Sequence, residues 1–165
     1  MGIDMRDKIP TTRAVIAIRK AGVSVRPHFV RYEKEAVTDS AAAGIGVTSH
    51  DVVKTLVMED HEENSFIVLM HGDMQVSTKE LARILGVKRV TPVTIKKAER
   101  LTGYMVGGIS PFGTRRKLPV YIEESILQLP RFYINGGRRG FLVEMLPREI
   151  EEILKPIKVV VGRST

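Results

Sequence analysis

The sequence contains no cysteine among its 165 residues. This absence excludes disulfide bonds, thiolate nucleophiles and cysteine-ligated metal sites, and it is typical of a protein that works in a reducing compartment. Long apolar runs are missing too, since none approaches the roughly 20 residues that a membrane-spanning helix needs. We therefore expect a cytoplasmic protein that does not cross a membrane.

The N-terminal stretch MGIDMRDKIP has neither an apolar segment nor a small-residue cleavage site, so we expect no secretory signal. After Gly2, position 6 is Arg, where N-myristoylation needs Ser or Thr. The sequence also lacks internal repeats, low-complexity tracts and linkers. It thus predicts a single domain over residues 1–165, long enough to bury a substantial core.

Lysine and arginine together number 26, against 19 aspartate and glutamate residues, which gives a formal net charge of +7. Such an excess raises encounter rates with polyanions and favours phosphate binding. Many basic proteins bind no nucleic acid, however, so the charge alone leaves both interpretations open.

The spacing of apolar residues predicts helices and strands mixed along the chain. Ser77 and Glu80 have capping-box spacing, and Thr91 with Pro92 fits the start of another helix. A hairpin is expected around Gly136–Gly137. This mixture favours an α/β or α+β fold with a mixed sheet. The expected helices are 10–22, 38–46, 77–87, 91–103 and 146–155, and the expected strands are 24–33, 51–59, 65–72 and 157–162.

Motifs that mark metal centres and hydrolase triads are missing. The four histidines, at positions 28, 50, 61 and 71, lie far apart along the sequence and lack metal-ligand spacing. Ser110 in GISPF is not a nucleophile elbow, because Phe112 stands where that motif has glycine. We therefore expect no metal, no cofactor and no serine triad, and a Ser110 that hydrogen-bonds the backbone or a ligand.

Two features remain that suggest a binding site. The glycines of GGISPFG leave peptide N–H groups free to face a carboxyl or ester oxygen, although a tight structural turn is the alternative. Lys54 interrupts an apolar strand; it is either an edge or snorkelling lysine, or a cation aimed at a phosphate or a developing oxyanion. Basic clusters at 96–100, 115–117 and 138–139 are solvated faces or a path for a polyanion.

Three segments together resemble the YbaK/EbsC family of aminoacyl-tRNA editing proteins, which is related to the editing domain of bacterial prolyl-tRNA synthetases. They are VVKTLV (52–57), LTGYMVGGISPFGTRRKLPVYI (101–122) and YINGGRRGFLVEM (133–145). The resemblance runs from about Pro10 to the C-terminal helix. It implies a mixed, barrel-like β-sheet surrounded by helices.

The resemblance also implies an activity, the hydrolysis of the ester between a wrong amino acid and the 3′ end of a tRNA. Cys-tRNA(Pro) is the expected substrate; Ala- or Ser-charged tRNA, and a non-catalytic module that binds tRNA or a synthetase, are the alternatives. The nucleophile would be water assisted by the ribose 2′-hydroxyl, or the thiol of the substrate's own cysteine. If that thiol cyclises onto the ester, the enzyme would be classed as a lyase. Aminoacyl-tRNA and prolyl-tRNA synthetase are the implied partners.

Positions that match the family motifs form the expected site. Leu142 departs from the pattern, because it places an apolar residue where relatives often have a polar one, and this leaves the amino-acid specificity open. By resemblance, Lys54, Gly107 and Ser110 are expected to be catalytic, Tyr32, Gly108, Ile109 and Pro111 to bind substrate, and Arg115, Arg116, Lys117, Arg138 and Arg139 to bind tRNA.

Overall fold

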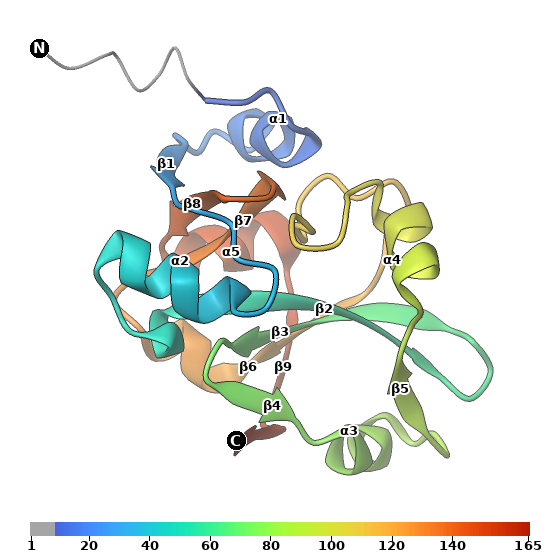
Figure 1. Cartoon of the computed structure of the whole chain (residues 1–165). Coiled ribbons are helices and arrows are strands. Elements are labelled where there is room, and N and C mark those ends of the chain that lie inside the picture. Colours follow the sequence, from blue (N-terminus) through green and yellow to red (C-terminus); the bar gives the residue numbers. More distant parts are fainter. Residues whose placement is uncertain (1–8) are drawn as a thin grey trace, which may run out of the picture.

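The computed structural model describes residues 9–165 (Figure 1). The expectations about a leader segment and about Gly2 concern residues outside the described ones. No helix of the described part is long and apolar enough to cross a membrane. The helices are α1 (Arg13–Lys20), α2 (Val37–Ile45), α3 (Thr78–Leu85), α4 (Ile95–Thr102) and α5 (Pro147–Leu154), with short 3-10 helices η2 (Ser49–Asp51) and η3 (Glu124–Gln128).

The strands form one large mixed sheet and a separate two-stranded pair. The large sheet has the order β1-β8-β7-β2-β3-β6-β9, with β5 also paired to β2, and the small pair is β10-β4. Parallel pairing of β2 with β7, β3 with β6 and β6 with β9 confirms the predicted mixed α+β class. The strands are β1 (Arg26–Phe29), β2 (Val52–Asp60), β3 (Ser65–His71), β4 (Met74–Val76), β5 (Val90–Pro92), β6 (Val120–Glu123), β7 (Phe132–Arg138), β8 (Phe141–Met145), β9 (Ile157–Val159) and β10 (Gly162–Ser164).

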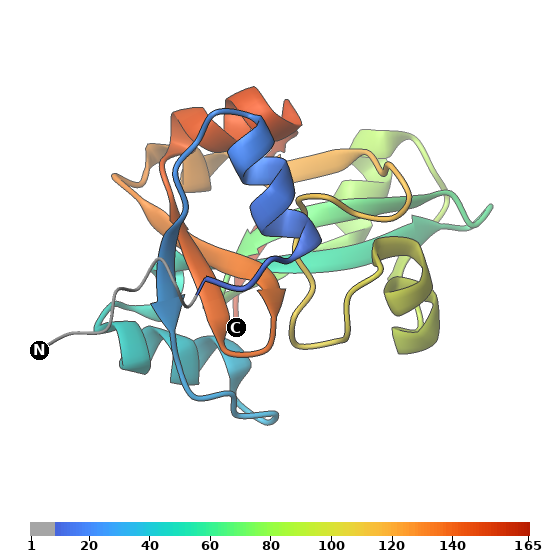
Figure 2. The same ribbon diagram turned by 90° about the horizontal axis from the view of Figure 1, so that it is seen from above.

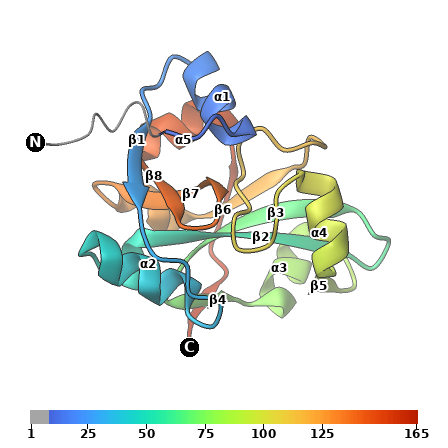
Figure 3. The same cartoon turned by 45° about the horizontal axis from the view of Figure 1, so that its top comes forward.

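Strand β3 is buried on both faces, and this places it at the centre of the molecule. Its residues Ile67 and Leu69 pack into the core that α1, α4 and α5 cover, whereas Phe66 and Val68 pack into the core beneath α3. Helices α1 and α3 accordingly lie on opposite sides of the molecule (Figures 1 and 3). Seen from above, α1 lies against the hairpin of β7 and β8 (Figure 2). The two-sided burial explains the continuous apolar run of this strand.

The expected helices all form, but two details of their ends differ from prediction. Ser77 caps α3 by accepting a hydrogen bond from the Glu80 N–H (3.2 Å). The other half of the predicted capping box is missing, because the Glu80 carboxylate pairs with Arg83 and the Ser77 N–H donates to the Val161 carbonyl instead.

The helix predicted for residues 91–103 begins later, at Ile95. Thr94, not Thr91, is its cap and accepts a hydrogen bond from the Lys97 N–H (3.2 Å). Thr91 and Pro92 belong to β5, which pairs with the end of β2. A pairing partner more than thirty residues away thus overrides the local start signal.

The hairpin of β7 and β8 turns at Arg139–Gly140 rather than at Gly136–Gly137. The two earlier glycines lie inside β7, where the register with β8 shifts between Asn135 and Arg138. The Asn135 side chain accepts hydrogen bonds from the N–H groups of Gly137 (2.6 Å) and Arg138 (3.1 Å). This side-chain bonding holds a bulge in the strand. Strands β4 and β10 were not predicted.

Candidate functional site

A cavity of about 410 Å³ brings together four segments that are far apart in the sequence. Figure 3 shows the loop that follows α4, coloured yellow to orange, beside β2. The lining residues are 30–32, 35–39 and 41 around α2, 52–56 of β2, 106, 107 and 109 of the loop after α4, and 135, 140 and 142 of the β7–β8 hairpin. The cavity is thus built by tertiary packing rather than by one local motif.

Lys54 lines this cavity from β2 and is half-buried. Its Nζ donates a hydrogen bond to the Met74 carbonyl oxygen at 2.5 Å. Burial lowers the pKa of Lys54 below its usual value, and the carboxylates of Asp73 and Asp39 partly offset this effect. The Lys54 side chain therefore brings an amino group to the cavity that is hydrogen-bonded to a carbonyl and lies in the field of two acidic residues.

Gly107 stands opposite β2 in a backbone conformation that favours glycine, with φ of +90°. A Cβ atom at this position would lie 2.7 Å from the ring of Tyr32, which also lines the cavity. The Gly107 carbonyl accepts a hydrogen bond from the Asn135 side chain (3.1 Å). The close approach of Tyr32 to the loop therefore depends on the missing side chain.

Only some peptide N–H groups of the loop are available to a ligand. The Val106 N–H donates to the Glu99 carboxylate (2.8 Å) and the Gly108 N–H to the Met105 carbonyl (2.8 Å). Pro111 has no N–H. Gly107 and Ile109, which both line the cavity, are left as the candidate donors.

Ser110 lies on the buried side of the loop, away from the cavity lining. It is fully buried, and its Oγ accepts a hydrogen bond from the Phe112 N–H (3.2 Å). The Tyr104 hydroxyl donates to the Phe112 carbonyl (2.5 Å), and burial raises the pKa of Tyr104 to about 12. Ser110 thus stabilises the loop through a buried hydrogen bond to the Phe112 N–H. Because it does not line the cavity, the geometry does not support the predicted catalytic role. Gly108 and Pro111 are likewise buried and do not line the cavity.

Arg139 is exposed yet firmly placed at the edge of the cavity. Its guanidinium lies 4.9 Å from the centroid of the Tyr32 ring, and its Nε donates to the Val106 carbonyl (2.9 Å). It thereby links two walls of the cavity. The other predicted tRNA-binding residues, Arg115, Arg116, Lys117 and Arg138, are also exposed. Leu142 is buried and forms an apolar part of the cavity wall.

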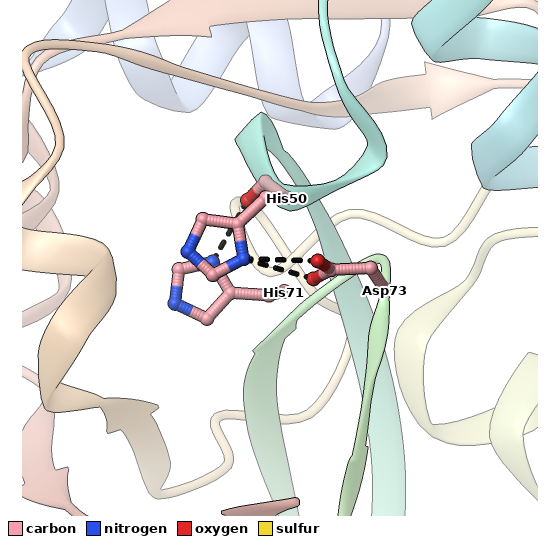
Figure 4. A group of neighbouring side chains, drawn as sticks. All are labelled: His50, His71 and Asp73. Carbon is pink, nitrogen blue, oxygen red and sulfur yellow. Dashed lines mark hydrogen bonds and ion pairs between the residues drawn. The ribbon is translucent and has the colours of Figure 1, made fainter. Parts of the chain in front are cut away.

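A second polar cluster lies at the C-terminal end of β3, where His50, His71 and Asp73 meet and His71 pairs with Val53 of β2 (Figure 4). The two imidazole rings stack, with centroids 3.7 Å apart and planes at 6°. The His50 Nδ1 lies 2.9 Å from the Asp73 carboxylate. His71 is fully buried, and burial lowers the pKa of its imidazole. The spacing of the histidines in the sequence did not predict this contact between His50 and His71.

The hydrogen bonds of His71 fix its tautomer. Its Nδ1 lies 2.8 Å from the His50 carbonyl, which only accepts, so this nitrogen carries the proton. Its Nε2 then accepts from the Ser125 hydroxyl at 2.7 Å. Both ring nitrogens of His71 are thus engaged in hydrogen bonds. Because the two imidazole rings are stacked in parallel planes, the in-plane lone pairs of their nitrogens do not converge on one metal ion.

Comparison with known proteins places the chain in a family. The model of the aminoacyl-tRNA editing domain family matches residues 33–153. Over 122 residues the chain is 30% identical to the Enterococcus faecalis protein named "Putative Cys-tRNA(Pro)/Cys-tRNA(Cys) deacylase EbsC", and the match covers 74% of each chain. Over 91 residues it is 22% identical to the proline–tRNA ligase of Brachyspira hyodysenteriae, which covers 55% of this chain and 16% of the ligase.

The fold agrees with these matches. A solved structure described as a "putative trans-editing enzyme for prolyl tRNA synthetase" superimposes with a TM-score of 0.81 at 21% identity, covering 92% of this chain and 96% of that one. The family match spans most of the cavity lining, including Lys54, Gly107 and Leu142. The chain therefore belongs to the aminoacyl-tRNA editing domain family.

Proposed function

We propose that this protein is a trans-acting deacylase that hydrolyses the ester bond of mischarged aminoacyl-tRNA, with Cys-tRNA(Pro) as the first candidate substrate. The observation that carries the proposal is the single cavity that joins Lys54, Tyr32 and the Gly107 loop. The name of the 30% identical relative supports the choice of the cysteinyl ester. Prolyl-tRNA synthetase is the proposed source of tRNA(Pro) specificity, in keeping with the ligase match.

In this proposal the protein supplies position and charge rather than a nucleophile. Among residues 9–165, no serine, histidine or cysteine lines the cavity. The N–H groups of Gly107 and Ile109 face the ester oxygen as negative charge develops, and Lys54 holds the nucleotide end. Because an aminoacyl ester is already activated, water or the thiol of a cysteinyl substrate completes the reaction once the ester is positioned.

The cavity wall favours a small, uncharged amino-acid side chain. Val30, Ile109 and Leu142 give it apolar surface. A thiol or methyl group packs against such a wall without leaving an unpaired polar atom, whereas the hydroxyl of serine would need a partner. We therefore place cysteine and alanine ahead of serine as the released amino acid.

The test is release of labelled amino acid from Cys-, Ala- and Ser-tRNA(Pro) and from correct Pro-tRNA(Pro). The wild type is expected to release one mischarged amino acid and to spare proline. Lys54→Ala is expected to lower the rate by about 100-fold, because the ester is no longer held in position once the nucleotide end loses its electrostatic contact. Lys79→Ala, which removes an exposed lysine on α3, is the matched control and should retain the wild-type rate.

Two results would count against the proposal. Full activity of Lys54→Ala would remove the role assigned to this lysine. Absence of release from all four substrates, together with protection of the ester from spontaneous hydrolysis, would instead identify a non-catalytic module that binds aminoacyl-tRNA.

A further inference from the structure

The outer edge of β2 is open where it meets the cavity. On this edge β7 pairs with β2 only at Val52 and Val53, and β5 pairs with it only from Met58 onward. On the opposite edge β3 pairs with β2 without interruption from Val53 to Glu59. The gap at residues 54–56 lines the cavity. A short piece of sheet edge is therefore presented to whatever the cavity holds.

The direction of the neighbouring hydrogen bonds shows which peptide groups face this gap. The Val52 carbonyl accepts from the Gly72 N–H (2.7 Å) on the side of β3, and the Val57 carbonyl accepts from the Val93 N–H (3.1 Å) on the outer side. Successive residues of a strand direct their N–H and C=O groups to opposite edges. Thr55, two residues before Val57, therefore directs its own N–H and C=O into the gap.

The side chain of Thr55 adds a third group. Its Oγ1 is buried and has no hydrogen-bond partner within residues 9–165. A buried hydroxyl without a partner is costly, so the arrangement suits a ligand that supplies one. By contrast, the neighbouring Asn135 side chain is already used to hold the loop and the β7–β8 turn.

We propose that Thr55 is the subsite for the α-amino group of the aminoacyl ester, which binds the open edge of β2 as one further residue of the sheet. This proposal rests on the deacylase function proposed above. Thr55 offers two acceptors, its carbonyl oxygen and its Oγ1, to an amino group with two or three N–H donors. Its peptide N–H is then a further donor to the carbonyl oxygen that the Gly107 and Ile109 N–H groups also face in the proposed mechanism.

This geometry defines a substrate class, namely aminoacyl esters with a free primary amino group. An N-acetylated amino group has a single N–H and an added acyl group, so it satisfies only one of the two acceptors. The Lys54 side chain does not compete for the position, because successive side chains of a strand point to opposite faces and its Nζ is bound to the Met74 carbonyl. Thr55 is thus the residue that binds the α-amino group of the substrate.

Binding of an analogue that cannot be hydrolysed tests the proposal without relying on turnover. The probes are 3′-deoxy-3′-(L-alanylamino)adenosine, which carries an amide in place of the ester, and the same compound acetylated on the alanyl nitrogen. Calorimetry should show at least about tenfold tighter binding of the free-amino compound to the wild type. Thr55→Val, which keeps the shape and removes the hydroxyl, should weaken that compound about tenfold and the acetylated one less than twofold.

Two further variants separate the hydroxyl from the fold. Thr55→Ser should restore the preference for the free amino group, and Thr91→Val, on the neighbouring β5 and outside the cavity lining, should leave both affinities unchanged. Equal binding of the two compounds by the wild type, an unaltered preference in Thr55→Val, or no binding of either at millimolar concentration would overturn the proposal. A wild type that prefers the free-amino compound but hydrolyses no aminoacyl-tRNA would support it while refuting the deacylase function.

Discussion

Gly107 and Gly46 have nearly the same φ angle in very different surroundings. Their φ angles are +90° and +89°. A Cβ on Gly107 would meet the Tyr32 ring at 2.7 Å, whereas a Cβ on Gly46 would have no atom within 4 Å. Alanine at either position costs about 1 kcal/mol or more in backbone strain, but only at Gly107 must a cavity residue also move.

Gly107→Ala is therefore expected to lower the deacylation rate by at least about tenfold, because moving Tyr32 would displace the cavity wall that lies against the loop and its N–H groups. Gly46→Ala should lose a similar amount of unfolding free energy and keep its activity. Initial rates and urea denaturation of both variants provide the measurement. Equal rates for Gly107→Ala and Gly46→Ala would show that the contact between Tyr32 and the loop does not position the substrate.

The sequence indicated several of the residues that lie near the cavity, but it did not indicate whether each side chain points into the cavity or into the core. Lys54, Gly107 and Ile109, which the family motifs predict to be site residues, all line the cavity. Ser110 belongs to the same motif but points into the core, and a residue-type pattern carries no information on that direction. Thr55 was overlooked because its role depends on where two other strands stop pairing.

At the scale of single elements, α4 shows that a strong local start signal can be set aside. Thr94 caps this helix by accepting a hydrogen bond from the Lys97 N–H. Glu99, further along α4, accepts a hydrogen bond from the Val106 N–H at the edge of the cavity. Thr94→Ala should lower the unfolding free energy by about 1 kcal/mol, since it removes the hydrogen bond to the first turn. Thr91→Ala removes a partly exposed threonine from β5 and should cost clearly less.

Denaturant unfolding of these two variants decides which threonine begins the helix. A larger loss of unfolding free energy for Thr91→Ala than for Thr94→Ala would mean that α4 begins at Thr91, as the sequence predicted. It would also contradict the assignment of Thr91 to β5. The two expectations differ because Thr-Pro at positions 91 and 92 satisfies the local rule for a helix start, whereas the pairing of Met58 to Asp60 with β5 is a long-range contact. Local spacing located the element but placed its beginning three to four residues too early.

At the scale of the whole molecule, the cavity exists because the sheet joins segments in an order unlike that of the sequence. Strand β2 lies between β7 and β3, and the hairpin of β7 and β8 reaches the loop that follows α4. The mixed fold class was predictable from the alternation of elements, but the strand order was not, since it depends on pairings between distant segments. The family resemblance predicted a mixed, barrel-like sheet surrounded by helices, but it specified no strand order.

The net charge of +7 is also a property of the whole molecule, and the fold determines on which surfaces the exposed cations lie. Arg115, Arg116 and Lys117 are exposed and follow the Gly107 loop directly along the chain. Lys79 on α3, and Lys88 and Arg89 just after that helix, are three other exposed cations, and α3 packs on the other core. If RNA lies along the Gly107 loop and the segment that follows it, only the first cluster releases counterions when the tRNA binds.

Replacement of Arg115, Arg116 and Lys117 by Gln should therefore weaken tRNA binding and reduce the slope of log K against log salt by about 2, since each phosphate contact contributes roughly 0.7–0.9. The same change at Lys79, Lys88 and Arg89 removes an identical charge and should leave the slope near that of the wild type. Filter binding of tRNA(Pro) and of an unrelated tRNA from 50 to 300 mM salt measures both. The loss should be alike for the two tRNAs, because phosphate contacts carry no base identity. A slope reduced equally by both triple variants would mean that overall charge, not the basic cluster that follows the Gly107 loop, governs binding.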